Sequence, residues 1–149
     1  MSKRKWFAGI FIKSVCCLYA LLFVYAAMSK LLDFENFGRQ LGQSPMLSAF
    51  AGWISWLVPG LEIGLALLLF VSQLRLIALF ASYLLMGMFT VYIYILLHYS
   101  AFVPCSCGGI LESLTWNEHM VFNTVFLLIA AIAILLYPSG ANFKNFRQL

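Results

Sequence analysis

Charged residues are scarce in this chain of 149 residues: only 9% are Asp, Glu, Lys or Arg, whereas 64% are hydrophobic. A soluble domain carries about 25% charged residues, so the composition excludes an ordinary soluble protein. Internal repeats and low-complexity tracts are also lacking. Little sequence remains outside the apolar stretches, so we expect one membrane domain, residues 1–149, and no separate soluble domain.

Four apolar stretches are long enough to cross a bilayer. They cover about residues 14–32, 53–72, 76–97 and 117–137. At about 1.5 Å of rise per residue, each can span a hydrocarbon core of about 30 Å. Lys30 and Glu62 are the charges that interrupt the first two stretches. The sequence therefore predicts an all-α integral membrane four-helix bundle with external connections at 33–52 and 98–116. The connection at 33–52 is expected to be an open loop or a short surface helix.

The basic residues are distributed unevenly around these stretches. Seven of the nine Lys and Arg fall on one side: Lys3, Arg4, Lys5, Lys13, Arg75, Lys144 and Arg147. The other side holds Lys30, Arg39, Asp33, Glu35, Glu112 and Glu118. By the positive-inside rule, both termini are expected in the cytoplasm of a bacterial inner membrane, with 98–116 on the periplasmic side. The net charge of +4 thus indicates topology, and no nucleic-acid partner is expected.

A cleaved signal peptide is the alternative for the first stretch. A basic start precedes an apolar run and the sequence YAAMS, which resembles a cleavage site. The run is longer than a usual signal core, and its helical pattern continues through Lys30 and Leu32, which favours a retained span. Cleavage would leave three spans and remove Cys16 and Cys17, which otherwise are expected to be ordinary small apolar residues.

The second and third stretches carry packing signals. Trp53 and Trp56 are placed for an interfacial aromatic belt, and Pro59 is expected to kink its helix. Gly60 and Gly64 form a pair that would let a neighbouring helix approach closely. The third stretch is rich in rings: Phe80, Tyr83, Phe89, Tyr92 and Tyr94. These rings suit a core and a lipid-facing surface, or a flat ligand such as a quinone.

The last stretch has a clear start signal. TWNE fits a capping box, with Thr115 as the N-cap and Glu118 three residues later. Trp116 then begins the helix, and His119 and Asn123 lie one turn apart on one face.

Two cysteines in CSCGG carry the most reactive chemistry. Cys105 and Cys107 are expected in an oxidising compartment, where paired thiols form disulfides. A bridge across one residue closes a small, strained ring, and strained exposed disulfides are easily reduced. Gly108 and Gly109 allow such a turn, and the following helix start favours a thiolate. The pair therefore predicts a redox-active dithiol. A static bridge, or a copper(I) or zinc site with His98 or His119, remains an alternative.

Three further residues are candidates for proton or charge chemistry. A carboxylate in a span, such as Glu62, is costly and marks function by default. Lys30 lies at a depth that makes an ion pair with Glu62 plausible, either as a link between helices or as part of a proton carrier. His119 is the acid–base candidate because its ordinary pKa is near neutral.

Several segments resemble one family of small membrane proteins. The segments are YAAMSKLLDFENF, VPGLEIGLALLL, CSCGG and LTWNEHMVFN, and together they resemble the MauE/DoxX group, its redox-associated MauE-type members in particular. The resemblance implies a four-helix inner-membrane protein linked to thiol–disulfide chemistry or to maturation of exported proteins, as in methylamine utilisation.

These observations predict a membrane-bound thiol–disulfide protein. Cys105 and Cys107 would exchange electrons with a periplasmic thiol protein, and His119 would move protons. Glu62 and Lys30 would form a polar centre in the bundle. Supporting positions would be Gly108, Gly109, Trp116 and Asn123. No metal or other cofactor is assigned, although a quinone is compatible with the rings. The alternatives are a non-catalytic assembly factor with a structural disulfide and a Cys/His metal carrier.

Overall fold

The computed structural model describes residues 3–44, 46–99 and 115–137, and every element within these ranges is helical. The long helices are α1 (Lys3–Leu32), α3 (Ala51–Phe70), α4 (Arg75–Tyr99) and α5 (Trp116–Leu135). All four are long and apolar enough to cross a membrane. The prediction of an all-α protein with four spans is therefore confirmed.

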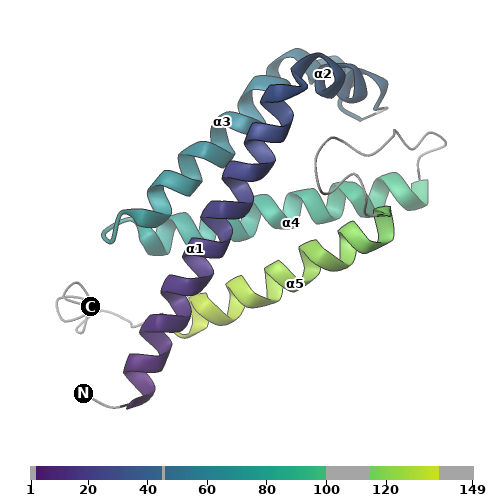
Figure 1. Cartoon of the computed structure of the whole chain (residues 1–149). Helices are drawn as coiled ribbons and strands as arrows, with labels where there is room; N and C mark the ends of the chain where they lie inside the picture. The colour runs from purple at the N-terminus through teal and green to yellow at the C-terminus, as the bar shows by residue number, and fades with distance from the viewer. Residues whose placement is uncertain (1–2, 45, 100–114, 138–149) are drawn as a thin grey trace.

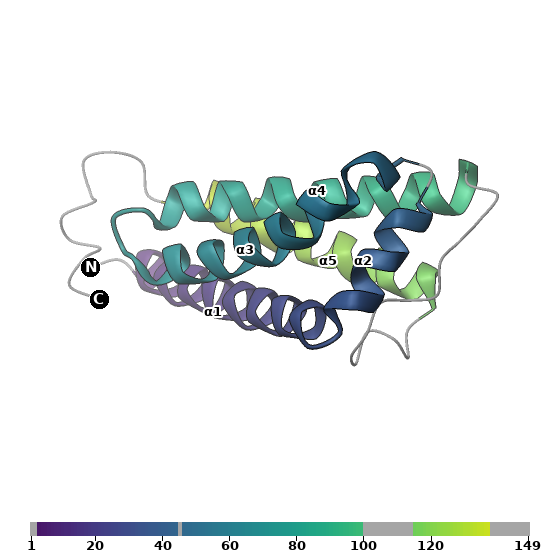
Figure 2. The same ribbon diagram turned by 90° about the horizontal axis from the view of Figure 1, so that it is seen from above.

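The four spans form two pairs that close into a ring. Helix α1 packs along α3, and α4 packs along α5, while α3 contacts α4 and α1 contacts α5. Figure 1 shows the two pairs close together at one end and diverging towards the end that carries α2 (Phe34–Gln43). Figure 2 shows the start of α1, the α3–α4 connection and the last turn of α5 at one end. The start of α5 and the last turn of α4 lie with α2 at the other.

The core lies between the spans and is apolar, with Tyr19 and Phe23 as its largest fully buried side chains. It consists of Ile12, Val15, Cys16, Tyr19, Ala20, Phe23, Leu65, Ala66, Leu69, Ala78, Leu79, Leu85, Met86, Ala130 and Ala133. The outward surface of the spans is equally apolar, as in Leu21, Leu67 and Val121, each more than 60% exposed. An apolar exterior of this kind suits a lipid bilayer, because no hydrophobic effect drives the burial of apolar side chains that are in contact with lipid.

The helix boundaries differ from the expected ones in two places. Helix α1 begins at Lys3, well before residue 14, because residues 6–12 are apolar as well, and the stretch apolar enough to span a membrane starts at Trp6. Most of the segment 33–52 is helical: α2 is followed by η1 (Ser48–Phe50), a short 3-10 helix. Phe37 and Leu41 recur one turn apart on the buried side of α2, which makes it an amphipathic surface helix and not an open loop.

Helix α3 departs from expectation at its glycines. A Cβ built on Gly60 or Gly64 would meet nothing within 4 Å, so no helix in the described part of the chain packs against them. The expectation that this pair brings a neighbouring helix close is therefore wrong within this chain. The contacts of α3 are made by its other side, which carries Pro59, Glu62 and Leu69. Helix α3 runs from Ala51 to Phe70 through Pro59 without a break.

The first turns of α3 carry the expected interfacial tryptophans. Trp53 is 81% exposed and Trp56 is 66% exposed, and the Trp56 ring lies 4.5 Å from the Phe34 ring of α2. Amphipathic rings of this kind prefer the boundary between lipid and water. The position of α2 beside them is therefore consistent with a helix at the membrane surface.

A hydrogen bond joins the first and last spans. The Tyr19 hydroxyl donates to the carbonyl oxygen of Phe126 at 2.8 Å, and the two rings meet edge to face at 5.3 Å. Tyr19 is fully buried. The bond fixes the rotation of α5 against α1, which hydrophobicity alone does not specify.

We expect Tyr19→Phe to lower the free energy of unfolding by roughly 0.5–1.5 kcal/mol, because the substitution removes this hydrogen bond and keeps the ring. Unfolding of the purified protein in detergent, followed by circular dichroism, measures the change. Tyr94→Phe is the matched control, since Tyr94 is exposed on α4. Equal stability of the Tyr19 variant and the parent protein would show that the bond contributes nothing.

Candidate functional site

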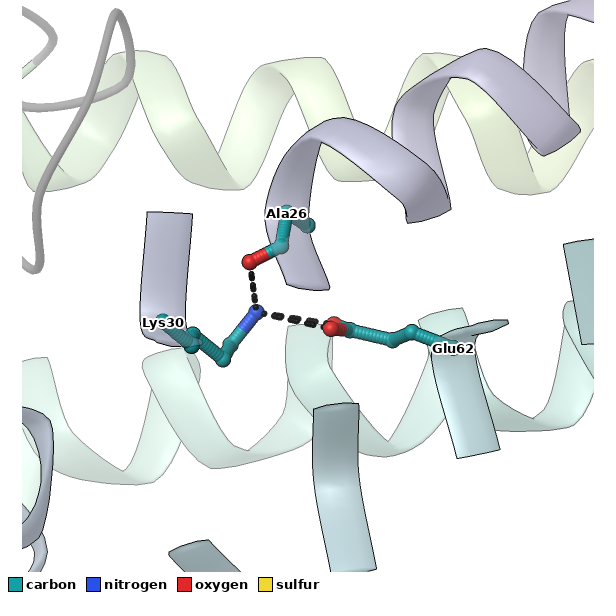
Figure 3. A network of polar contacts seen from close by, with 3 residues as sticks. All are labelled: Ala26, Lys30 and Glu62. Carbon is teal, nitrogen blue, oxygen red and sulfur yellow. Dashed lines mark hydrogen bonds and ion pairs between the residues drawn. The ribbon is translucent and has the colours of Figure 1, made fainter. Parts of the chain in front are cut away.

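A buried ion pair lies in the half of the bundle that carries α2. Lys30, in the last turn of α1, donates from Nζ to Glu62 Oε1 at 2.8 Å and Oε2 at 3.1 Å. The same Nζ donates to the carbonyl oxygen of Ala26 at 3.2 Å (Figure 3). Glu62 is completely buried and Lys30 is 18% exposed. An ammonium group has three N–H donors, so Lys30 is fully hydrogen-bonded.

Two rings from other helices complete the surroundings of Lys30. Phe37 of α2 and Phe89 of α4 each have their ring centroid 5.9 Å from Lys30 Nζ. A cation over a ring face is attracted by its electrons, more strongly where water is excluded. The ion pair therefore draws together α1, α2, α3 and α4. From the sequence, Phe89 was expected only as one ring of the third stretch, and neither phenylalanine was expected beside Lys30.

A second contact holds α2 on the bundle. The Tyr92 hydroxyl of α4 donates to Ser44 Oγ at 3.0 Å, and Ser44 caps the end of α2 and is fully buried. Tyr92 was expected only as one ring among several in the third span. Its hydroxyl instead ties the α4 span to the surface helix that lies over Lys30.

The start of α5 is fixed by the capping box expected there. Glu118 N–H donates to Thr115 Oγ1 at 3.4 Å, and Thr115 N–H donates to Glu118 Oε2 at 2.7 Å. Trp116 follows as the first helical residue, and its ring lies nearly parallel to the His119 ring with centroids 6.4 Å apart. His119 is half-buried, and its ring interacts electrostatically with the Lys30 charge.

Asn123 lies one turn deeper than His119 and is 3% exposed. Its Nδ2 has no hydrogen-bond partner, and among the buried side-chain nitrogen and oxygen atoms of the described residues it is the one so left. Lys30, which pairs with Glu62, is thus also the charge that acts on His119, and Asn123 is next along the His119 helix face. Sequence reasoning grouped His119 with Asn123 and Lys30 with Glu62, but it did not join the two groups.

The other candidates lie elsewhere or outside the described residues. His98 is exposed at the end of α4, with Nδ1 2.9 Å from the carbonyl oxygen of Tyr94 and its ring stacked on the Tyr94 ring. Cys16 is part of the core and Cys17 is exposed, both in α1. Cys105, Cys107, Gly108 and Gly109 fall in 100–114, outside the described ranges.

Fold and sequence together define a multi-pass membrane protein with a charged centre between its spans. The family model described as methylamine utilisation protein MauE matches residues 6–136. The chain therefore belongs to the MauE family, and the resemblance noted from its motifs is confirmed. No curated protein and no solved structure matches the chain.

Proposed function

We propose that this MauE-family protein is a membrane-bound thiol–disulfide protein in which Cys105 and Cys107 exchange electrons with a periplasmic thiol protein. A thiolate attacks a disulfide sulfur of the other partner, a mixed disulfide forms and one sulfur leaves as thiolate. The second cysteine then attacks the mixed disulfide, so that two electrons and two protons have passed between the partners. His119, near the start of α5, donates a proton to the leaving thiolate or accepts one from the attacking thiol.

One observation carries this proposal: both described residues that flank the cysteine segment, Tyr99 and Thr115, lie at the bundle end that carries α2. Thr115 is fixed there by the capping box, and His119 follows in the first turns of α5. The acids Asp33, Glu35 and Glu118 belong to elements at the same end, together with the basic residues Lys30 and Arg39. Further basic residues, Lys3, Lys13 and Arg75, belong to the other end. This separation of charge supports cytoplasmic termini and a periplasmic cysteine segment in the inner membrane.

The Lys30–Glu62 pair has a part in this proposal beyond joining α1 to α3. Glu62 is completely buried and Lys30 is 18% exposed, so loss of either charge would leave the other without its partner. The Lys30 charge also acts on His119. We expect the pair to hold the electrostatic environment in which His119 moves its proton. The whole chain, residues 1–149, would act as one membrane domain.

Capture of a mixed disulfide tests the proposal directly. In cells that carry Cys107→Ser, Cys105 cannot be released from a bound partner, so a covalent adduct is expected on a non-reducing gel and should vanish on reduction. Cys105→Ser is the reciprocal variant, and comparison of the two shows which cysteine attacks. Absence of an adduct from both variants, with stoichiometric copper or zinc in the purified parent protein, would support a metal carrier instead.

A further inference from the structure

Asn123 has an unused donor in a place where such donors are normally satisfied. Its neighbours in α5 have their polar atoms engaged: the Thr124 hydroxyl donates to the carbonyl of Met120, and Phe126 accepts from Tyr19. Lys30 has all three donors engaged. A buried amide without a partner is costly, and in hydrocarbon no water compensates it. Among the buried side-chain nitrogen and oxygen atoms of the described residues, Asn123 Nδ2 is therefore the one that lacks a hydrogen-bond partner.

The depth of Asn123 limits what can accept this bond. Tryptophan marks the membrane interface, and Asn123 follows Trp116 by seven residues, which is about 10 Å along a helix. The ester carbonyls of phospholipids lie at the edge of the hydrocarbon, so they are too shallow. Helix α5 is the least buried of the four spans, which leaves it accessible to molecules dissolved in the bilayer.

We propose that a quinone binds at Asn123, with one quinone carbonyl oxygen accepting a hydrogen bond from Asn123 Nδ2. A quinone head is flat, apolar enough to enter hydrocarbon and carries a carbonyl acceptor. Aromatic rings suited to pack against it lie along this stretch of α5: the ring centroids of Phe122 and Phe126 are 4.7 Å apart, and that of Phe126 is 5.3 Å from Tyr19 of α1.

This inference rests on the proposed thiol exchange, because it supplies the electron acceptor for that exchange. Oxidation of the Cys105–Cys107 dithiol breaks two S–H bonds, forms one S–S bond and releases two electrons and two protons. The quinone takes up both electrons and both protons and becomes the quinol. His119 lies one turn from Asn123 towards the start of α5, and we expect it to supply protons to the quinone.

Thermal unfolding of the purified full-length protein in dodecyl maltoside, with and without decyl-ubiquinone, tests the site. A ligand that binds only the folded state raises the unfolding midpoint with concentration. We expect such a rise for the parent protein, and an apparent Kd about tenfold higher for Asn123→Leu, which lacks the donor. Thr124→Val, a polar-to-apolar change at the neighbouring position, is the matched control and should behave as the parent does. Equal Kd values for Asn123→Leu and the parent would overturn the proposal.

Ligand-free Asn123→Leu should be at least as stable as the parent, since leucine has a similar volume and leaves no unpaired amide. Should this variant fail to fold, a photoreactive azidoquinone on the unmodified protein decides instead. Its attachment is expected between His119 and Phe126, or on side chains facing them, and excess decyl-ubiquinone should prevent it. Labelling elsewhere, or labelling without competition, would overturn the site, as would stabilisation by dioleoyl phosphatidylcholine but not by decyl-ubiquinone.

Failure of this inference can be told apart from failure of the proposed function. Quinone binding does not require thiols, so a Cys105→Ser, Cys107→Ser double variant should keep the parent's Kd. Absence of quinone binding together with cysteine-dependent client oxidation would overturn the quinone site alone. Quinone binding at Asn123 together with client oxidation that persists without the cysteines would overturn the thiol exchange alone.

Discussion

Glu62→Ala is expected to destabilise the bundle by about 3–5 kcal/mol. The substitution leaves the Lys30 ammonium without its carboxylate partner, in a place where it is only 18% exposed. The remaining acceptor, the Ala26 carbonyl, cannot balance a full charge. Unfolding of the detergent-purified variant measures the loss, and a strongly reduced amount of protein in the membrane is expected to accompany it. A decrease in the free energy of unfolding of less than about 1 kcal/mol would mean that water solvates Lys30 as it solvates the charges of an exposed ion pair.

The double variant Lys30→Met, Glu62→Leu separates structure from function at this pair. Replacing both charges by apolar side chains of similar size is often neutral or stabilising, so the double variant should fold at least as well as the parent. The proposed role of the pair in the electrostatics of His119 predicts that this stable variant is nevertheless slow in client oxidation. Parent-like activity in the double variant would reduce the pair to a link between α1 and α3.

Replacing Cys105 or Cys107 by serine is expected to reduce oxidation or reduction of the client to the background rate while the protein amount stays unchanged. Serine keeps the size of the side chain but cannot form the S–S bond on which the exchange depends. Quantitative thiol alkylation of the client in membranes gives the rate. Cys17→Ser is the matched control, because Cys17 is an exposed cysteine in α1 outside the proposed site.

Loss of the protein itself in both single variants would contradict this prediction. That outcome would mean that the two sulfurs hold a structural bridge, as expected of a non-catalytic assembly factor. Normal protein amounts with normal client oxidation would contradict both readings.

Local signals in the sequence predicted the parts of the site that depend on neighbouring residues. Thr115 and Glu118 form the capping box because both partners lie within one turn, so spacing alone is sufficient. The Lys30–Glu62 pair could be expected from the similar depth of the two residues in the membrane, because each charge interrupts an otherwise apolar span and has few other charged residues to pair with. The segment 33–52 was expected to be an open loop or a short surface helix, and the sequence did not decide between the two; the buried side of α2 decides for the helix.

Contacts that depend on helix rotation could not be predicted. The spans are apolar all round, and a lipid-facing side chain looks the same in the sequence as a core side chain. Nothing therefore marked Tyr19 as the partner of Phe126, or Tyr92 as the partner of Ser44. For the same reason Gly60 and Gly64 were assigned to the wrong side of α3, and the unpaired amide of Asn123 became visible only with the neighbouring helices in place.

Labelling of intact cells with a membrane-impermeant maleimide tests most directly whether the protein displays a redox-active cysteine couple outside the cytoplasm. After treatment with an impermeant reductant, Cys105 and Cys107 should both be labelled before lysis, and after reoxidation neither should be. A Lys3→Cys variant, at the start of α1, provides the cytoplasmic control and should react only once the cells are broken. Labelling of Cys105 and Cys107 that also requires lysis would contradict the account, as would labelling that does not change with oxidation.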